Sequence, residues 1–144
     1  CPAMAGESQA EAYVKHLGIG QIVDLLPYQN RKQMADLFRK SQVVISITEH
    51  DGTPNTLLEA MACGCFPIAG DIAALREWII PGKNGLLVNP NNPYELAQAI
   101  IDALDNLPMR NSAREYNRRL IEQSADYRMV MEAASAFYRE LIDH

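Results

Sequence analysis

The sequence predicts an α/β domain in which a parallel β-sheet is covered by helices on both faces. Short runs rich in apolar and β-branched residues alternate with segments of helical spacing, and the connections between them are short. Such alternation is typical of βαβ units, whose strands run parallel. With 144 residues, of which 48% are hydrophobic and 22% charged, the chain fits one folded domain.

Periodicity and breaker residues place the elements up to residue 88. Residues 43–47 are dense in β-branched side chains, as a central strand is, and residues 31–40 repeat apolar side chains on one helical face. A short apolar run at residues 22–26 is stopped by Pro27. The expected helices are residues 9–18, 31–40, 53–63 and 73–80, and the expected strands are residues 43–47, 66–69 and 85–88.

Capping residues mark the later helices. Asn92 is expected to cap a helix that runs to about Asp105. Pro93 suits the first position of that helix, because an N–H there would have no helical partner. Ser112 begins a capping-box sequence, which predicts the start of the next helix.

The C-terminal part is predicted to be a helical tail. Residues 106–112 are the expected hinge, which divides the chain into an α/β core of residues 1–109 and a tail of residues 110–144. No strand separates the last two helices, so we expect them to pack as an appendage. The last helix has apolar side chains at spacings of three and four, which predicts a buried face. That face comprises Tyr127, Val130, Ala134, Phe137 and Leu141.

Composition excludes several classes of function. The formal net charge is −5 with scattered Lys and Arg, which argues against a nucleic-acid partner. No apolar run reaches the roughly 18 residues that cross a membrane, and no signal peptide is visible. We therefore expect a cytoplasmic protein without a transmembrane segment, and membrane-surface association of the full protein stays open. The chain opens on Cys1 rather than Met, which suggests a segment of a longer protein.

The three cysteines are interpreted as reduced thiols. Their odd number, at Cys1, Cys63 and Cys65, gives no regular disulfide framework. Cys63 and Cys65 would supply half of a metal site, but none of the three histidines sits at ligand spacing. Small buried thiols at a helix end are the favoured interpretation, and no metal is expected.

The stretch EHDGTPNTLLEAMACG, residues 49–64, follows the first expected strand. Thr53 is predicted to cap the helix, Pro54 suits its first position, and Gly64 would end it in a left-handed conformation. Its leucines, alanines and methionine predict that much of the helix is covered by the sheet. Glu59 is the only charged residue of the helix, and a buried charge is costly unless it is paired or bound.

The position and spacing of these residues predict a nucleotide-sugar site. Ligands bind such sheets at the carboxyl ends of the strands, where this loop lies. Glu59 shares a helical face with Asn55 and Thr56, about 6 Å below the free amides of the helix start. Those amides suit a phosphate, and a carboxylate one turn further suits the hydroxyls of a sugar. Gly52 allows close backbone approach, and Asp51 would receive a second pair of hydroxyls.

Simpler interpretations of the same residues stay open. Asp51 and Gly52 form a common turn pair, in which Asp51 would only brace the helix start. Glu59 would then be solvated at a helix edge or paired with a lysine. His50 is best interpreted as a loop residue beside the site rather than a catalytic one.

These motifs resemble the E-x7-E region of the retaining family-4 (group 1) glycosyltransferases, which have the two-domain GT-B fold. Asp51 and Glu59 have that spacing, with Asp in place of the first Glu. Residues 52–55 occupy the place of the family's glycine-rich loop, and residues 58–64 are very similar to its helix. The resemblance extends to residues 37–46 before the loop, and to residues 67–70, Glu77 and residues 84–88 after it.

The resemblance implies a Rossmann-like C-terminal domain that holds a nucleoside-diphosphate sugar, while a missing N-terminal domain binds the acceptor. It places Asp51 at the transferred sugar as the catalytic contact. The donor-binding residues that it implies are Gly52, Thr53, Pro54, Asn55, Thr56 and Glu59, with Glu59 at the ribose. Pro27, Tyr28 and Met34 fall where the base commonly rests, although Tyr28 either stacks on the base or packs on a neighbouring loop.

The resemblance further implies that the full-length enzyme transfers a hexose with retention of configuration, as in polysaccharide biosynthesis. Its members need no metal or other cofactor, and the leaving diphosphate is stabilised electrostatically. The family's Arg and Lys pair belongs upstream of Cys1, because Arg31, Lys32 and Arg76 do not match its motif. The isolated chain is therefore expected to be inactive. A nucleotide-sugar epimerase on the same fold and a non-catalytic binding module are the alternatives.

Overall fold

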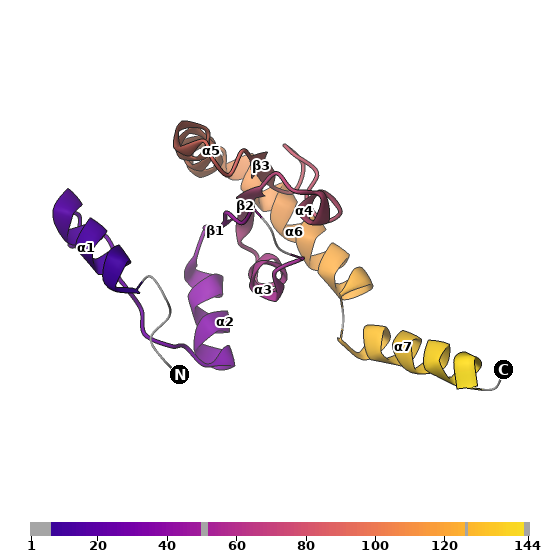
Figure 1. The fold of residues 1–144 in the computed structure, drawn as a ribbon. Coiled ribbons are helices and arrows are strands. Elements are labelled where there is room, and N and C mark those ends of the chain that lie inside the picture. The colour runs from indigo at the N-terminus through magenta and orange to yellow at the C-terminus, as the bar shows by residue number, and fades with distance from the viewer. Residues whose placement is uncertain (1–6, 50–51, 126, 143–144) are drawn as a thin grey trace. The chain divides into compact units, whose positions relative to one another are not determined.

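The computed structural model describes residues 7–49, 52–125 and 127–142, and the chain divides into two compact units, residues 1–32 and 33–144 (Figure 1). In the first unit, helix α1 (Glu7–Leu17) ends at Gly18, which has a φ of 67°. This left-handed conformation is the usual way for glycine to end a helix, as the sequence predicts. The apolar run at residues 22–26 forms no strand with the residues that the structure describes.

The second unit contains a parallel sheet of three strands, in the order β1 (Val43–Ser46), β2 (Phe66–Gly70) and β3 (Leu86–Val88). Val43 lies beside Phe66 in the β1–β2 pair, and Ile68 lies beside Leu86 in the β2–β3 pair. All residues of the central strand β2 are buried. These strands match the predicted ones to within two residues at each end, and the expected α/β fold class is confirmed.

Helices cover both faces of this sheet, which confirms the predicted layers. The α5-side cluster joins one face to α5 (Pro93–Asp105), and the α3-side cluster joins the other face to α3 (Asn55–Ala62) and α4 (Ala73–Arg76) (Figure 1). The buried members of the α5-side cluster are Phe66, Ile68, Val88, Ala99, Ala103 and Ala113. Those of the α3-side cluster are Leu57, Met61, Ala69, Leu75 and Ile79.

Most helix ends follow the predicted capping. The bounds of α2 (Arg31–Lys40) are as predicted, and the Asn92 side chain accepts a hydrogen bond of 3.2 Å from the Glu95 amide at the start of α5. Gly64 follows α3 with a φ of 95°, the left-handed conformation predicted for it.

Helix α6 (Leu107–Ser124) differs from the prediction because it starts earlier. Asn106 caps it, accepting a hydrogen bond of 3.0 Å from the Met109 amide, and Ser112 lies inside the helix. Residues 107–112 are thus helical rather than a hinge, and residue 109 lies within α6. The helix is no appendage, since it packs on α3 and contributes Ala113 to the α5-side cluster, while Leu120 packs against the α3-side cluster.

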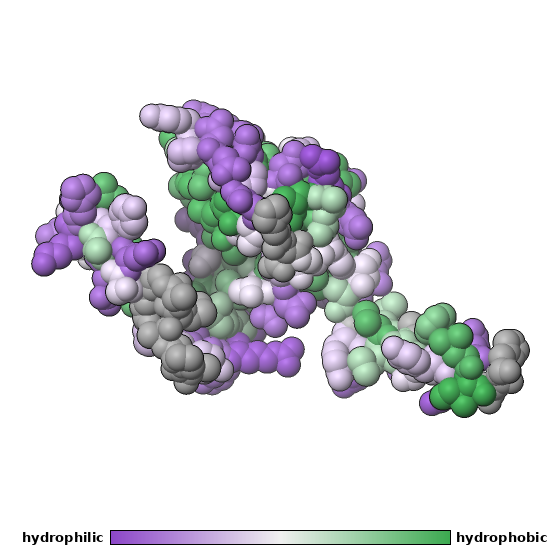
Figure 2. All heavy atoms as spheres, viewed as in Figure 1, coloured by the Kyte–Doolittle hydropathy of each residue, from purple (hydrophilic) through white to green (hydrophobic). Residues whose placement is uncertain are grey.

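The predicted buried face of the last helix is wrong. Helix α7 (Tyr127–Ile142) forms as expected, but most of its apolar side chains are exposed, and Figure 2 shows apolar residues on its surface. Of the residues predicted to be buried, Tyr127, Val130, Phe137 and Leu141 are exposed, and Ala134 is half-buried. A helical period identifies an apolar face, but it does not supply the partner that would cover it.

Candidate functional site

The loops that follow the three strands meet at the carboxyl edge of the sheet. Strands β1 and β2 run parallel and end at Ser46 and Gly70, so the loops that follow them leave the sheet at the same edge. A Cβ atom built at Gly70 would lie 2.7 Å from the Thr48 carbonyl oxygen and 3.1 Å from Cγ of Pro90. Gly70 therefore packs directly against the loops after β1 and β3, and no larger residue fits there without displacement.

A buried hydroxyl lies at the same edge. The Thr48 Oγ is buried and has no hydrogen-bond partner among the residues that the structure describes. Leaving a buried hydroxyl without a partner costs on the order of 1–3 kcal/mol. The edge that the sequence predicts to bind a ligand thus contains a polar group whose bonding is incomplete in the described part of the chain.

Helix α3 starts at this edge with uncapped amides. Pro54 is its N-cap residue and makes no side-chain cap hydrogen bond, while the Leu57 amide donates to the Pro54 carbonyl at 3.0 Å. The amides of Asn55 and Thr56, at the first two helical positions, precede that bond and have no helical acceptor. The prediction that Thr53 caps the helix is wrong, because the proline cap leaves the Thr53 side chain bonded elsewhere.

Glu59 lies on the exposed face of α3 together with Asn55 and Thr56. This confirms that the three residues share one helical face. Glu59 is not covered, since the buried face of α3 is the opposite one, with Leu57, Ala60 and Met61. An exposed carboxylate has no desolvation cost to offset. A ligand at Glu59 is therefore inferred from the position of this residue and not from its burial.

Thr53 is bound by a tryptophan from the segment after α4. Nε1 of Trp78 donates a hydrogen bond of 3.1 Å to the Thr53 hydroxyl oxygen. Trp78 is half-buried and packs against the α3-side cluster. The loop before α3 is thereby joined to residues 77–80, which sequence reasoning did not connect with it.

A fully buried pair of asparagines joins that segment to α6. The Asn84 Nδ2 group donates to the Asn117 Oδ1 atom at 2.8 Å and to the Trp78 carbonyl at 2.9 Å. The Asn117 Nδ2 group donates back to the Asn84 carbonyl at 2.8 Å, and the Asn84 Oδ1 atom accepts from the Ile80 amide at 2.7 Å. Sequence reasoning missed this pair. The signal was available, since Asn117 shares a helical face with Ala113, Leu120 and Ile121.

Arg76 and Asp71 form an ion pair in the loop after β2. The guanidinium donates two hydrogen bonds to the carboxylate, of 2.7 and 3.0 Å. The side-chain hydrogen bond from Arg76 holds the pKa of Asp71 below its ordinary value, and the same bond raises the pKa of Arg76. Because both side chains are largely exposed, the pair contributes little to stability. The ion pair does engage Arg76, which is the arginine nearest in sequence to the carboxyl edge of the sheet.

The remaining predicted site residues lie in separate parts of the chain, and their assignment to a ligand stays a prediction. Asp51 and His50 lie outside the described ranges. Pro27 and Tyr28 belong to the first unit, where both are exposed. Met34, in the second unit, is half-buried and packs against a small cluster of Phe38, Ala60 and Cys65.

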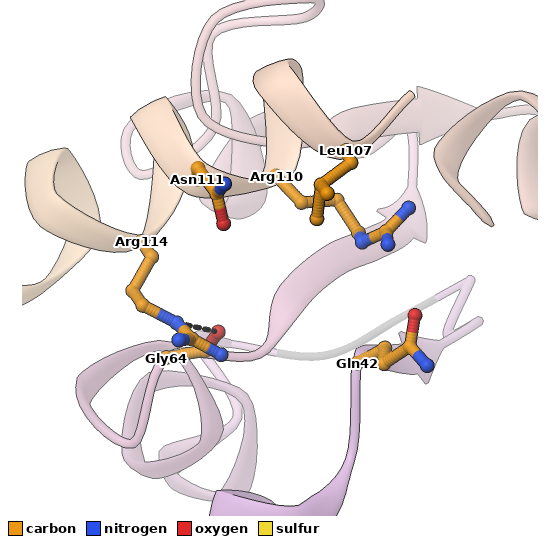
Figure 3. Close-up of a pocket in the computed structure, with 6 residues that line it drawn as sticks. All are labelled: Gln42, Gly64, Leu107, Arg110, Asn111 and Arg114. Carbon is orange, nitrogen blue, oxygen red and sulfur yellow. Dashed lines mark hydrogen bonds between the residues drawn. The ribbon is translucent and has the colours of Figure 1, made fainter. Parts of the chain in front are cut away.

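A separate pocket of about 290 Å³ lies at the opposite edge of the sheet (Figure 3). It is lined by Gln42, Gly64, Leu107, Arg110, Asn111 and Arg114. The guanidinium of Arg114 donates to the Gly64 carbonyl at 3.3 Å, and that of Arg110 donates to the Ala103 and Leu104 carbonyls at the end of α5. Both arginines thus bind carbonyls at helix ends, where a cation is favourable.

Cys65 is a buried free thiol, as predicted for the helix end. Its Sγ atom contacts the Phe38 carbonyl oxygen at 3.0 Å. Burial, together with the neighbouring Cys63, raises the pKa of Cys65 to about 11, although Arg114 opposes this shift. Cys63 is half-buried and also free. Among the described residues, no three His, Cys, Asp or Glu side chains gather as metal ligands, and no helix is long and apolar enough to cross a membrane.

Comparisons with known proteins agree with this architecture. The chain is 30% identical to a D-inositol 3-phosphate glycosyltransferase of Jonesia denitrificans over 122 residues, which are 85% of this chain and 28% of that protein. The structure of this chain is similar to that of sucrose-phosphate synthase from Thermosynechococcus elongatus, with a TM-score of 0.89 and 23% identity. The similarity covers 94% of this chain and 34% of the synthase. The chain is also similar to the Anabaena protein HepE, solved in complex with UDP, with a TM-score of 0.78 and 20% identity over 90% of this chain and 36% of that one.

The chain spans between 19% and 34% of the length of the curated relatives that it matches. The solved structures share less than 25% identity with it, so they show the fold alone, which is the Rossmann-like α/β fold that the sequence predicts. The family model described as "Glycosyl transferases group 1" matches residues 3–120, which is most of the chain. This chain is therefore a member of the group 1 glycosyl transferase family.

Proposed function

We propose that this chain supplies the donor-binding half of a retaining glycosyltransferase, and that the full-length enzyme moves a sugar from a nucleoside diphosphate to an acceptor. The observation that carries the proposal is the start of α3 at the carboxyl edge of the sheet. There the uncapped amides of Asn55 and Thr56 share one exposed helical face with Glu59. Family membership supports the reaction class.

Each group has a chemical role in this proposal. The amides of the α3 start and its helix dipole bind the diphosphate, and Gly52 is open on its Cβ side for close approach of the ligand. Glu59, one helical turn further, accepts hydrogen bonds from the ribose hydroxyls. Asp51 contacts the transferred sugar, and the base rests near Pro27, Tyr28 and Met34. Catalysis is electrostatic, through stabilisation of the leaving diphosphate without a metal.

The donor site is tested by titration calorimetry of the full-length enzyme with UDP, because the Anabaena relative was solved with UDP. GDP and ADP are titrated in parallel. Glu59→Gln should weaken binding of the preferred nucleotide roughly 10- to 100-fold, the equivalent of about 1.5–3 kcal/mol for hydrogen bonds to a charged group. The matched control is Glu115→Gln, which changes an exposed glutamate of α6. Equal affinity of the two variants, or no binding of any of the three nucleotides, would refute the site.

Asp51 and the stereochemistry need a separate measurement. Because Asp51 is assigned to the sugar and not to the nucleotide, Asp51→Asn should lower kcat and leave nucleotide affinity unchanged. Proton NMR of the product should show the same anomeric configuration as the donor. An inverted product would refute retention, and conversion of the nucleotide sugar to its epimer without an acceptor would instead identify an epimerase.

A further inference from the structure

The loop before α3 depends on few side chains for its position. Gly52 has no side chain, and Pro54 caps the helix without a side-chain hydrogen bond. Within the described residues, the bond from Trp78 to Thr53 is the side-chain hydrogen bond that reaches residues 52–56. Among the described residues, the indole N–H of Trp78 is therefore the side-chain donor that ties this loop to the segment after α4.

Trp78 is itself positioned by a network of hydrogen bonds from buried side chains. Its carbonyl accepts a hydrogen bond from the buried Asn84, which pairs with Asn117 of α6 through two further bonds of 2.8 Å. Lys83 of the same segment lies over the ring of Tyr116 on α6, 4.3 Å from the ring centre. Buried amides keep such geometry because every lost bond leaves an unsatisfied polar group.

The Thr53 hydroxyl has one more bond to make. A threonine hydroxyl accepts and donates, and here its oxygen accepts from the indole of Trp78. Its own hydrogen has no acceptor among the residues that the structure describes. A hydroxyl fixed in this way, beside the uncapped amides of α3, can donate to a phosphate or sugar oxygen with little loss of side-chain freedom.

We propose that Trp78 is a positioning residue for the nucleotide sugar, and that it fixes the Thr53 hydroxyl as a hydrogen-bond donor to an oxygen of the diphosphate sugar. This inference rests on the proposed donor site. Helix α6 supports the loop before α3 indirectly, because its Asn117 pairs with Asn84, and Asn84 binds the carbonyl of Trp78. Trp78 touches no ligand in this scheme, and Thr53 does.

The test uses Trp78→Phe, Thr53→Val and the double variant in the full-length enzyme. Phenylalanine keeps an aromatic ring and removes the N–H, and valine keeps the shape of threonine and removes the hydroxyl. Trp78→Phe should raise the donor KM about 2- to 10-fold, as expected for one neutral hydrogen bond, and leave the acceptor KM unchanged. Thr53→Val should raise the donor KM at least as much. The double variant should match Thr53→Val rather than the product of both effects.

A spectroscopic readout separates positioning from stability. The ¹⁵N–¹H indole signal of Trp78, assigned by its loss in Trp78→Phe, should shift in Thr53→Val and should shift on UDP addition only when Thr53 is present. A fall in melting temperature with an unchanged donor KM in Trp78→Phe would make the bond merely structural and overturn the inference. Multiplicative effects in the double variant would also overturn it.

The two proposals fail in different ways. If Glu59→Gln leaves nucleotide affinity unchanged, the donor site itself is refuted. If Glu59→Gln weakens binding while Trp78→Phe and Thr53→Val leave the donor KM unchanged, the donor site stands and only the role of Trp78 is refuted.

Discussion

Replacing Asn117 by leucine should destabilise the second unit substantially. Asn117 is fully buried and makes two hydrogen bonds of 2.8 Å with Asn84. Leucine has a similar size but leaves one amide hydrogen and the carbonyl of Asn84 unsatisfied. Each unsatisfied buried group costs about 1–3 kcal/mol, and burial of the apolar leucine side chain offsets about 1.5–3 kcal/mol. The midpoints of these ranges give a net loss of about 2 kcal/mol, against a typical total stability of about 5–15 kcal/mol.

Urea-induced unfolding of the 144-residue chain measures this loss. Trp78 is the single tryptophan of the chain and its carbonyl belongs to the same network, so its fluorescence reports on the region directly. The midpoint should fall while the slope of free energy against urea stays constant. Asn111→Leu, an exposed position on the same helix, is the matched control and should change stability by less than about 0.5 kcal/mol. Equal midpoints for the two variants would refute the energetic role assigned to the pair.

Three further predictions address other parts of the structure. Gly70→Ala should both lower the melting temperature and raise the donor KM, because the new Cβ would lie 2.7 Å from the Thr48 carbonyl oxygen. If neither quantity changes, the carboxyl edge of the sheet is less tightly packed than this distance implies. The lowered pKa of Asp71 means that the ion pair with Arg76 stabilises the folded chain above pH 4 and that this contribution is lost as the pH falls through the folded-state pKa. Acid unfolding curves should therefore show a smaller loss below pH 4 for Asp71→Asn than for the wild type, whereas parallel curves would exclude a contribution from the pair. With a pKa of about 11, the Cys65 thiol should be about one part in a thousand thiolate at pH 8, so mass spectrometry should find it unmodified by iodoacetamide in buffer and modified in urea.

Local signals in the sequence predicted the strands and most helix ends, because these depend on nearby residues. β-Branched runs marked β1, and Asn92 and Gly64 set helix ends through their own side-chain or backbone conformation. The start of α6 was misplaced because two capping sequences compete, and Asn106 caps the helix while Ser112 lies within it. Local sequence does not decide which of two adequate caps is used.

Tertiary features were predicted less well. The apolar period of α7 predicted the helix correctly and its burial wrongly, because burial depends on a partner surface. The bond from Trp78 to Thr53 joins residues 25 positions apart, and the Asn84–Asn117 pair joins residues 33 positions apart. Such contacts leave no period in the sequence. Only the polar Asn117 on an otherwise apolar helical face gave a local sign of them.

The exposure of Glu59 changes how its role must be tested. A buried carboxylate would need a partner, and its replacement by glutamine would alter the free energy of unfolding. Glu59 is exposed, so Glu59→Gln should leave stability within about 0.5 kcal/mol of the wild type, as surface substitutions usually do. A ribose contact predicts a loss of nucleotide affinity in the same variant, whereas a merely solvated glutamate predicts no loss. Urea unfolding and UDP titration of one variant therefore separate the two roles, and a large loss of stability would show that Glu59 braces the fold instead.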